Sequence, residues 1–323
     1  MSEGGDFTPA SWAPSSFKDA RKAYDTHARR SYDDAAASGK TTKDLLEARL
    51  KTKCAKPLII LCDQTGSMGE WPAVIFSKLP YLDHEVSEYL GKDSEVAVGA
   101  IGDAQNHETY PLQARPFCRG EELQKRLKEL VIEANGGGNN KESYELGLLY
   151  ALKNVDMPKA DHPILILICD EDIYDTITPA HAAQYGIKIK ETMTIEEICE
   201  GLKEKYGAVY VLRKFYSSQQ MNERIRGRWA KMLGNDHVIQ LDDPNRAVDV
   251  ILGILAKESG KIDYFREEFE DRQKDNPEYY PVVYKALETV HGPAPAGGKT
   301  KKGPAGKSTM HKPGKGKKSD DLL

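Results

Sequence analysis

The sequence predicts an α/β protein with a doubly wound, mostly parallel sheet, one antiparallel edge strand and helices on both faces of the sheet. Two observations lead to this fold class. Short continuous apolar runs, such as LIILC (58–62) and PILILIC (163–169), are typical of parallel strands that are buried on both faces. Longer segments with the apolar spacing of helices, for example residues 71–90 and 194–207, alternate with these runs.

The predicted elements follow one another from residue 58 to about residue 257. We expect strands at residues 58–62, 95–102, 163–169, 208–215 and 237–241, and residues 107–117 could add an edge strand beside the second. We expect helices at residues 71–90, about 120–132, 142–154, 194–207, about 219–233 and 244–257. Asp243 is expected to cap the last helix, because an Asp side chain accepts hydrogen bonds from free amides and Pro244 suits the first helical position.

The chain divides into four segments by composition. Residues 54–258 are the predicted domain, between an N-terminal extension with helical segments (1–53) and a C-terminal helical extension (259–290). Residues 291–323 are rich in Lys, Gly and Pro, and we expect this tail to be disordered. The N-terminal extension is too polar to form a core alone. We expect it to cover an open edge of the sheet, with docking to a partner as the alternative.

Charge is distributed unevenly along the chain. The net charge of −4 combines +6 in residues 291–323, which carry eight lysines and two aspartates, with −10 in the remainder. Clustered lysines could bind nucleic-acid phosphates without reading their sequence. The tail has no aromatic residue that could stack on bases, so a solvated tail is the alternative.

Composition also bounds the compartment. The five cysteines are dispersed and form no C-x-x-C pair, which favours reduced thiols over a disulfide framework. No apolar run reaches the roughly 18 residues of a membrane helix, and the N-terminal segment lacks the basic and apolar regions of a secretory signal. We therefore expect a cytoplasmic protein that does not bind membranes.

Polar side chains follow the predicted strands at the points where the strands end. Asp63, Thr65 and Ser67 follow the first strand, Asp103 follows the second and Asp170 follows the third strong strand. In open α/β sheets the loops at the carboxyl ends of the strands form the ligand site, so these side chains are expected to meet. Carboxylates brought close together repel one another unless a cation lies between them. Oxygen ligands without His or Cys suit a hard ion, so the sequence predicts a site for Mg²⁺, or for Mn²⁺ or Ca²⁺.

The segment LIILCDQTGSM resembles the first strand and the metal-ion-dependent adhesion site of von Willebrand factor type A-like domains, in particular those of intracellular prokaryotic proteins. The family pattern Asp-x-Ser-x-Ser reads here as Asp63, Thr65 and Ser67, and threonine keeps the hydroxyl. The resemblance implies that Thr65 and Ser67 bind the metal, that Asp63 ligates it or orients it through water, and that Asp170 approaches from the far strand. It extends over residues 54–258, where AIGDAQN and ICDED also resemble family strand ends.

The glycine-rich loop GGGNNKES departs from the family pattern, which usually supplies a threonine ligand here. Asn139, Asn140 or Ser143 could replace that threonine, and the sequence leaves these alternatives open. Glu142 is interpreted as an ordinary residue in the first turn of the next helix, where a negative charge complements the helix dipole.

Two aspartates are candidates for residues that support the ligands without binding the metal. These are Asp103 and Asp172. The alternatives are that Asp103 starts a turn, and that Glu171 and Asp172 are solvated charges of a loop.

Two further motifs are not expected to carry chemistry. GPAGKST (303–309) ends like a P-loop, but Lys301 stands where the first glycine belongs, and no strand precedes the segment. DQT is similar to the start of a phosphatase D-x-D-x-T motif, but Gln64 occupies the place of the general acid. A glutamine cannot transfer that proton.

The predicted function is therefore binding rather than catalysis. Uncharged hydroxyl ligands leave the metal with a vacant position, which an Asp or Glu of a partner protein can fill. The resemblance implies an adaptor role beside a MoxR-type AAA+ ATPase or another operon-encoded protein. The alternatives are a Mg²⁺-dependent phosphohydrolase with Asp63 as nucleophile, and a nucleic-acid-associated factor that acts through residues 291–323.

Overall fold

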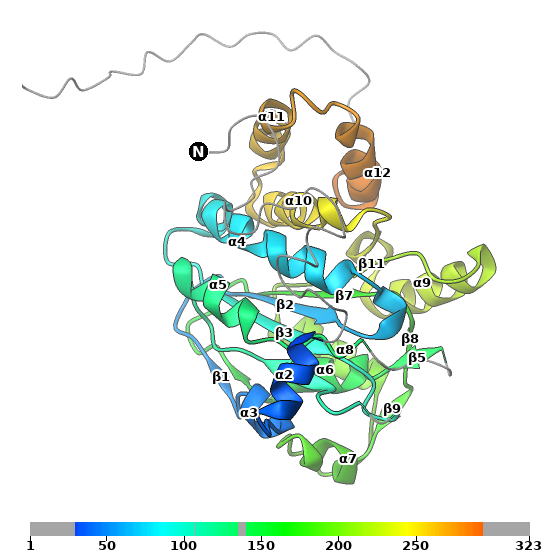
Figure 1. The fold of residues 1–323 in the computed structure, drawn as a ribbon. Coiled ribbons are helices and arrows are strands. Elements are labelled where there is room, and N and C mark those ends of the chain that lie inside the picture. Colours follow the sequence, from blue (N-terminus) through cyan, green and yellow to red (C-terminus); the bar gives the residue numbers. More distant parts are fainter. Residues whose placement is uncertain (1–29, 107, 135–139, 293–323) are drawn as a thin grey trace, which may run out of the picture. The chain divides into compact units, whose positions relative to one another are not determined.

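A six-stranded sheet lies at the centre of the residues that the computed structural model describes, which are 30–106, 108–134 and 140–292 (Figure 1). Its strands are β2 (Leu58–Asp63), β3 (Val96–Ile101), β4 (Leu112–Ala114), β7 (Ile164–Cys169), β11 (Ala208–Arg213) and β12 (Val238–Gln240). Their order in the sheet is β12-β11-β7-β2-β3-β4. All neighbours are parallel except β4, which pairs antiparallel with β3 at one edge. The predicted mostly parallel sheet with one antiparallel edge strand is confirmed.

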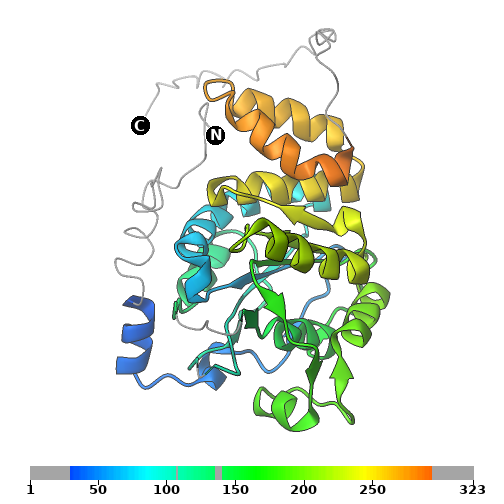
Figure 2. The same cartoon turned by 90° about the vertical axis from the view of Figure 1, so that its right-hand side faces the viewer.

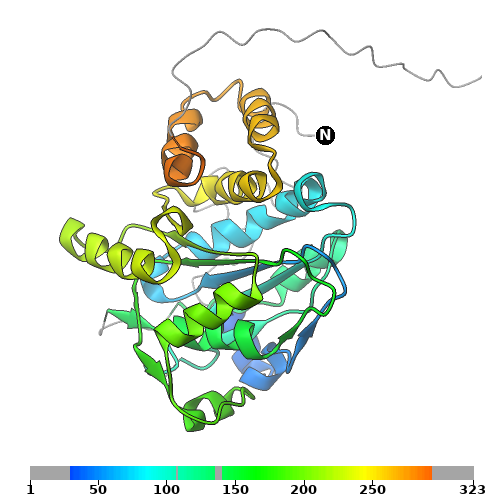
Figure 3. The same cartoon turned by 180° about the vertical axis from the view of Figure 1, so that it is seen from behind.

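Helices pack on both faces of this sheet. Alternate residues of β2, such as Leu58 and Ile60, share a core with α4 (Trp71–Leu90), α5 (Glu121–Lys128) and α10 (Ala247–Ser259). The residues between them, Ile59 and Leu61, share the opposite core with α6 (Tyr144–Lys153), α8 (Ile195–Lys205) and α9 (Gln219–Leu233). Figures 1 and 3 show the sheet between these two helical layers. Every position of β2 is buried because both of its faces are covered, which is why its sequence is apolar from Leu58 to Cys62.

The chain reverses the direction in which it adds strands beside β2. From β2 it proceeds to β3 and β4 on one side, and later to β7, β11 and β12 on the other. The carboxyl ends of β2 and β7 are therefore neighbours at a topological switch point, where open α/β sheets form their ligand crevices. Pairing of Cys62 with Ile168 sets the register that brings the two following loops together.

The helix boundaries agree closely with the sequence for α4 and α9, whereas other elements differ at their ends. The helix expected to extend to residue 132 ends at Lys128, and the edge strand occupies only β4. Asp243 accepts a hydrogen bond from the Asn245 amide at 2.9 Å, but it caps a short 3₁₀ turn (Pro244–Arg246) that leads into α10.

Segments on either side of the predicted domain pack against it. Helix α2 (Arg30–Ala37) is followed by α3 (Thr42–Leu45), which contacts the edge strand β4, and Leu46 forms a parallel bridge to Ala114. This short segment covers the sheet edge, as expected for part of the N-terminal extension. Helices α11 (Ile262–Arg272) and α12 (Tyr279–His291) pack on α10, as Figure 2 shows. All described residues fall within one compact unit, and the tail beyond residue 293 lies outside them.

Several short elements were not foreseen from the sequence. The first is a parallel pair of β1 (Leu50–Lys51) with β6 (Val155–Asp156), and the second is a parallel pair of β5 (Lys141–Glu142) with β8 (Asp172–Ile173). A hairpin of β9 (Thr176–Ile177) and β10 (Met193–Thr194) encloses α7 (Pro179–Gln184). Strands of two residues are too short for a periodic pattern to reveal them.

Two further expectations can be compared with the described residues. All five cysteines are buried and free. Among residues 30–106, 108–134 and 140–292, no helix combines the length and apolar character that crossing a bilayer requires.

Candidate functional site

A continuous chain of hydrogen bonds joins the loops after β2 and β7. The Thr65 amide and hydroxyl both donate to Oδ1 of Asp63, at 2.8 and 2.7 Å. The Thr65 and Ser67 hydroxyl oxygens lie 3.1 Å apart, and Ser67 donates to Oδ1 of Asp170 at 3.1 Å. The structure thus brings together Asp63, Thr65, Ser67 and Asp170, the four residues to which the family resemblance assigned the metal site.

The two hydroxyls in this chain have too few protons for all of their contacts. Each hydroxyl has a single proton. If Thr65 donates to Asp63 and Ser67 donates to Asp170, no proton remains for the contact between the two hydroxyl oxygens. In that state the two hydroxyl oxygens, 3.1 Å apart, face each other with lone pairs only, and a cation bound by both would remove this conflict. Without a cation, a proton on Asp63 resolves the conflict, because Thr65 can then donate to Ser67.

Asp63 is fully buried, and its other carboxylate oxygen accepts a hydrogen bond from the Tyr144 hydroxyl. Burial, together with the nearby charge of Asp170, raises the pKa of Asp63 to about 8. The carboxyl group therefore tends to keep a proton at neutral pH unless a positive charge enters the site.

Asp170 is also buried, but cationic groups surround it. The Lys214 ammonium lies 3.4 Å from its Oδ2 and donates a hydrogen bond to the main-chain oxygen of Ser67. The buried Arg213 guanidinium donates to the main-chain oxygen of Asp170 at 2.7 Å. Burial raises the pKa of Asp170, while Lys214 and the Ser67 hydroxyl oppose that rise.

Glu142 is the clearest correction to the sequence analysis. Ser143 is the N-cap of α6, so Glu142 precedes the helix and is not a first-turn residue. Its side chain is fully buried, and neither carboxylate oxygen has a hydrogen-bond partner among the described residues. Burial raises its pKa to about 11, and the charges of Asp63 and Asp103 add to that rise. A buried carboxyl group beside Asp63 with no donor facing it is a candidate cation ligand that the sequence reading missed.

The other residues of the glycine-rich loop have different partners. Asn139 lies outside the described residues. Asn140 is exposed, and its side-chain oxygen accepts a hydrogen bond from the Tyr216 hydroxyl at 2.7 Å. The Ser143 hydroxyl donates to Oδ1 of Asp103 at 3.2 Å and accepts from the Ala104 amide at 3.0 Å. Ser143 therefore connects the loop to Asp103.

The two aspartates expected to support the ligands differ in their surroundings. Asp103 is buried and also accepts hydrogen bonds from the Tyr174 hydroxyl at 3.2 Å. Asp172 forms ion pairs of 3.0 Å with Arg224 and Arg228 of α9. These arginines account for the buried charge of Asp172, so its contacts give it a structural role in holding α9 against the loop after β7.

Glu171 and Gln64 complete the surroundings of the site. Burial and the charge of Asp170 raise the pKa of Glu171 to about 7, and its Oε2 has no hydrogen-bond partner. Glu171 is therefore buried in the site and is not a solvated loop charge. The Gln64 side chain donates to Oε2 of Glu108 at 3.1 Å and accepts from the Glu133 amide. Gln64 thus ties the DQTGS loop to the loop after β3.

The donor set fits a hard divalent cation. Two hydroxyls, the carboxyls of Asp63 and Asp170, and the unpartnered Glu142 supply only oxygen, the ligand type that Mg²⁺, Mn²⁺ and Ca²⁺ prefer. In the described part of the chain, no three His, Cys, Asp or Glu side chains form a metal-holding group by themselves. Any cation here would therefore depend on the hydroxyls of Thr65 and Ser67 in addition to the carboxylates.

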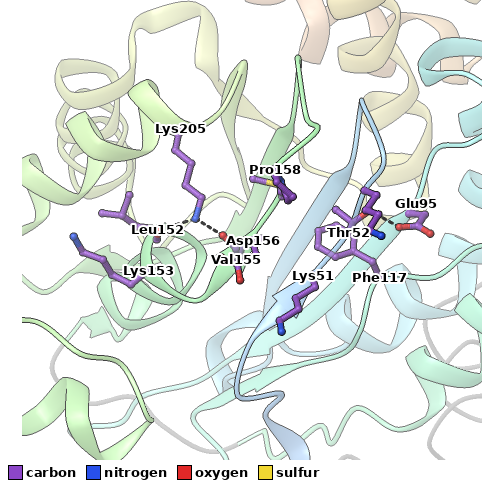
Figure 4. A pocket seen from close by; sticks show the side chains of 12 residues that line it. Lys51, Thr52, Glu95, Phe117, Leu152, Lys153, Val155, Asp156, Pro158 and Lys205 are labelled. Atoms are coloured by element: carbon purple, nitrogen blue, oxygen red, sulfur yellow. Dashed lines mark hydrogen bonds between the residues drawn. The ribbon is translucent and has the colours of Figure 1, made fainter.

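A pocket of about 980 Å³ lies at the opposite edge of the sheet, near the amino ends of the strands (Figure 4). Glu95, Phe117 and Lys205 are among its lining residues. The Lys205 ammonium donates to two main-chain oxygens at the end of α6 and to that of Val155 in β6, at 2.6 to 3.0 Å, and Thr52 donates to Glu95. These groups are satisfied within the chain, and the pocket shares no residue with the DQTGS loop.

No protein-family model matches the chain, and no curated protein matches it either. Similar solved structures include the pilus adhesin SpaC from Lactobacillus rhamnosus GG, which is 11% identical over 70% of this chain and 32% of its own, with a TM-score of 0.44. They also include proximal thread matrix protein 1 from the mussel byssus, which is 13% identical over 64% of this chain and 48% of its own, with a TM-score of 0.43. The matched region is thus less than half of each of these chains. TM-scores at this level support no conclusion about function.

Proposed function

We propose that the DQTGS loop binds a hard divalent cation, and that the bound cation carries the contact between this protein and an acidic side chain of a partner protein. The chain would then be a doubly wound domain of the von Willebrand factor type A-like kind, acting as an adaptor and not as an enzyme. The observation that carries the proposal is the hydrogen-bonded chain from Asp63 through Thr65 and Ser67 to Asp170.

The chemistry of these residues favours binding. A hydroxyl that donates its proton to a carboxylate still offers lone pairs to a cation, so Thr65 and Ser67 can act as neutral ligands. Neutral hydroxyl ligands can leave a coordination position of the cation open, and a carboxylate from outside can fill that position. Ser67 is partly exposed whereas Asp63 and Thr65 are buried, so an incoming group has access from the side of Ser67.

The surface beside Ser67 suits a protein partner. Phe215 follows Lys214, whose ammonium group contacts Ser67, and at 37% it is the large apolar side chain among the described residues that is exposed. A partner segment with an acidic residue beside an apolar one would match both features. A MoxR-type AAA+ ATPase or another operon-encoded protein is the class of partner that the family resemblance suggests.

Phosphohydrolase chemistry is less well supported. Oδ1 of Asp63 accepts two hydrogen bonds from Thr65, and Oδ2 accepts one from Tyr144. A nucleophilic carboxylate needs an oxygen that can approach the substrate, and the fully buried Asp63 presents none to solvent. Metal-dependent turnover of a generic phosphoester would revive this alternative. The nucleic-acid alternative depends on the tail, residues 291–323, which lies outside the described residues apart from its first two.

The proposal is tested in two steps with one variant and one control. Ser67→Ala removes a partly exposed hydroxyl, and Ser87→Ala removes a similarly exposed hydroxyl from the far end of α4. Calorimetric titration with Mg²⁺ and with Mn²⁺ should give binding to the wild type and to Ser87→Ala, and much weaker binding to Ser67→Ala. Affinity capture from a cell extract, with Mg²⁺ or with EDTA, should then give partners that are lost with EDTA and with Ser67→Ala. A wild type that binds neither ion, or partners that remain bound under both conditions, would exclude the metal as the contact.

A further inference from the structure

Lys214 is the only lysine that the described contacts place against both loops of the candidate site. It follows β11 directly, and its main-chain amide donates to the Cys169 oxygen at 2.9 Å, which fixes the start of its loop beside β7. Its ammonium group reaches across the switch point to the main-chain oxygen of Ser67 and to Oδ2 of Asp170. The side chain is 25% exposed, so the ammonium group retains access to water.

The two oxygens of Asp170 face different partners. Oδ1 accepts the Ser67 hydroxyl at 3.1 Å, and Oδ2 lies 3.4 Å from the Lys214 ammonium. Asp63, Glu142 and Glu171 are further acidic groups of the site, and burial is the main reason that the pKa of each is raised. The buried Arg213 guanidinium donates to the main-chain oxygen of Asp170 and to Asn222 of α9. Lys214 is therefore the cation that meets the Asp170 carboxylate itself.

We propose that Lys214 is the built-in counter-cation of this site, and that a divalent cation must share Asp170 with it. This inference rests on the proposed function and specifies how the site is regulated. In the absence of metal, the ammonium offsets the charge of Asp170 and the protein keeps its fold. When a divalent cation binds, repulsion between the two positive charges opposes it, so Lys214 lowers the metal affinity and makes occupancy depend on the cation concentration and on an added partner carboxylate.

A positioning role for Lys214 would have the opposite effect. If its contacts with Ser67 and Asp170 served mainly to hold these ligands in place, removing the ammonium group would weaken metal binding. If Lys214 competes with the metal, removing its charge tightens binding. The sign of the change in affinity therefore separates the two roles.

Three variants test this sign. Lys214→Gln loses the charge but keeps a donor for the Ser67 main-chain oxygen, and Lys214→Arg keeps the charge. Lys203→Met is the control, because Lys203 lies on α8 and pairs with Glu200 in solvent. Calorimetric titration with Mn²⁺ gives the affinity of each full-length protein, and the rise in melting temperature with Mn²⁺ gives an independent measure.

The expected result is that Lys214→Gln binds Mn²⁺ about tenfold more tightly than the wild type, as the loss of a neighbouring like charge predicts. Lys214→Arg and Lys203→Met should remain close to the wild type, and Mn²⁺ should raise the melting temperature of Lys214→Gln most.

Unchanged or weaker binding by Lys214→Gln, while the wild type binds, overturns the role of Lys214 and leaves the metal site standing. If neither protein binds Mn²⁺, the proposed function fails together with this inference. Lys214→Gln could fail to fold without metal. In that case the fold should be restored by a Mn²⁺ concentration lower than the one that half-saturates the wild type. If Mn²⁺ does not restore the fold, the result opposes the proposal.

Discussion

The Ser67 hydroxyl lies 3.1 Å from Oδ1 of Asp170, although 103 positions separate the two residues in the sequence. This contact links the carboxyl ends of β2 and β7, which are neighbours only because the strand order reverses beside β2. It places a hydroxyl from the DQTGS loop against the carboxylate that the family resemblance assigned to the far strand. The switch point therefore determines which residues meet, and the DQTGS loop supplies the hydroxyl oxygens of the proposed metal site.

Asp170→Asn should strongly weaken metal binding without unfolding the protein. The asparagine keeps an oxygen acceptor for Ser67 but loses the charge that a cation needs. We expect the Mn²⁺ affinity to fall by about a hundredfold or more, the upper end of what is lost when groups behind a metal ligand are changed. Asp161→Asn, an exposed position before β7 at the other edge of the sheet, is the control. Calorimetric titration gives the affinities and circular dichroism checks the fold. Equal affinities for the two variants would exclude Asp170 as a ligand.

Glu142→Gln should separate metal binding from stability. The pKa of Glu142 is raised to about 11, so the side chain is protonated at pH 7 without a cation, and an amide of the same size should replace it at a cost within about 1 kcal/mol. Metal binding should weaken by about tenfold, because an amide cannot ionise to meet the cation.

Glu145→Gln is the matched control for this prediction. Glu145 is also fully buried with both carboxylate oxygens unpartnered, but its nearest charges are Asp103, Lys141 and Asp175 rather than Asp63. Its substitution should leave the Mn²⁺ affinity unchanged. Urea unfolding with EDTA measures stability, and titration measures affinity. If both variants lose Mn²⁺ affinity equally, the loss comes from replacing any buried carboxyl group in this region. Glu142 would then have no direct role in binding the metal.

The sheet and its site were predictable from the sequence to different degrees. The long buried strands have continuous apolar runs, and the strand-end rule then identified Asp63, Ser67 and Asp170. Glu142 was misjudged because helical spacing begins at that residue, while the two-residue pairing of β5 with β8 delays the helix until after Ser143. Such a pairing depends on residues 31 positions away and leaves no local pattern.

Lys214 was missed because the strand expected at residues 208–215 included it. In the structure β11 ends at Arg213, so Lys214 occupies a strand end, to which the rule that identified Asp170 applies. A single lysine after a strand is common on protein surfaces, however, and only the strand order shows that β11 lies next to β7. The Gln64–Glu108 contact had no such signal, because it connects the centres of two irregular loops.

Glu108→Gln should change how stability depends on pH. Burial raises the pKa of Glu108 to about 8, from an ordinary value of 4.5. Between these values the folded protein holds a proton that the unfolded chain has released. The stabilisation is therefore complete below about pH 4.5 and is lost as pH rises towards 8. Glu108→Gln cannot titrate, so its stability in EDTA should be flatter from pH 5 to pH 8.

Urea unfolding at four pH values across this range measures the effect. By pH 8 the free energy of unfolding of the wild type should have fallen by about 2–4 kcal/mol relative to that of the variant. One unit of pKa shift corresponds to about 1.4 kcal/mol, and neighbouring acidic groups share the change. Glu88→Gln, an exposed position on α4, provides the control and should follow the wild type. Parallel curves for wild type and Glu108→Gln would show that Glu108 ionises normally.

Two glycine substitutions should have opposite effects on stability. A Cβ atom at Gly147 would lie 2.2 Å from Cδ1 of Ile101, because α6 packs closely on β3. Ile101 is fully buried and cannot move aside freely, so Gly147→Ala should cost about 1–3 kcal/mol from overpacking, partly offset by about 1 kcal/mol of helix propensity. A Cβ atom at Gly227 in α9 would meet nothing within 4 Å. Gly227→Ala should therefore stabilise the protein by about 0.5–1 kcal/mol.

The same pair tests how closely α6 is coupled to the site. Tyr144 begins α6 and donates to Asp63, so a shift of the helix away from β3 would move this donor. Gly147→Ala should lower both the free energy of unfolding and the Mn²⁺ affinity, whereas Gly227→Ala should raise the former and leave the latter unchanged. Urea unfolding and calorimetric titration on both variants give the four values. Full Mn²⁺ affinity in a destabilised Gly147→Ala would mean that β3 or Ile101 yields to the added methyl group while α6 and Tyr144 stay in place.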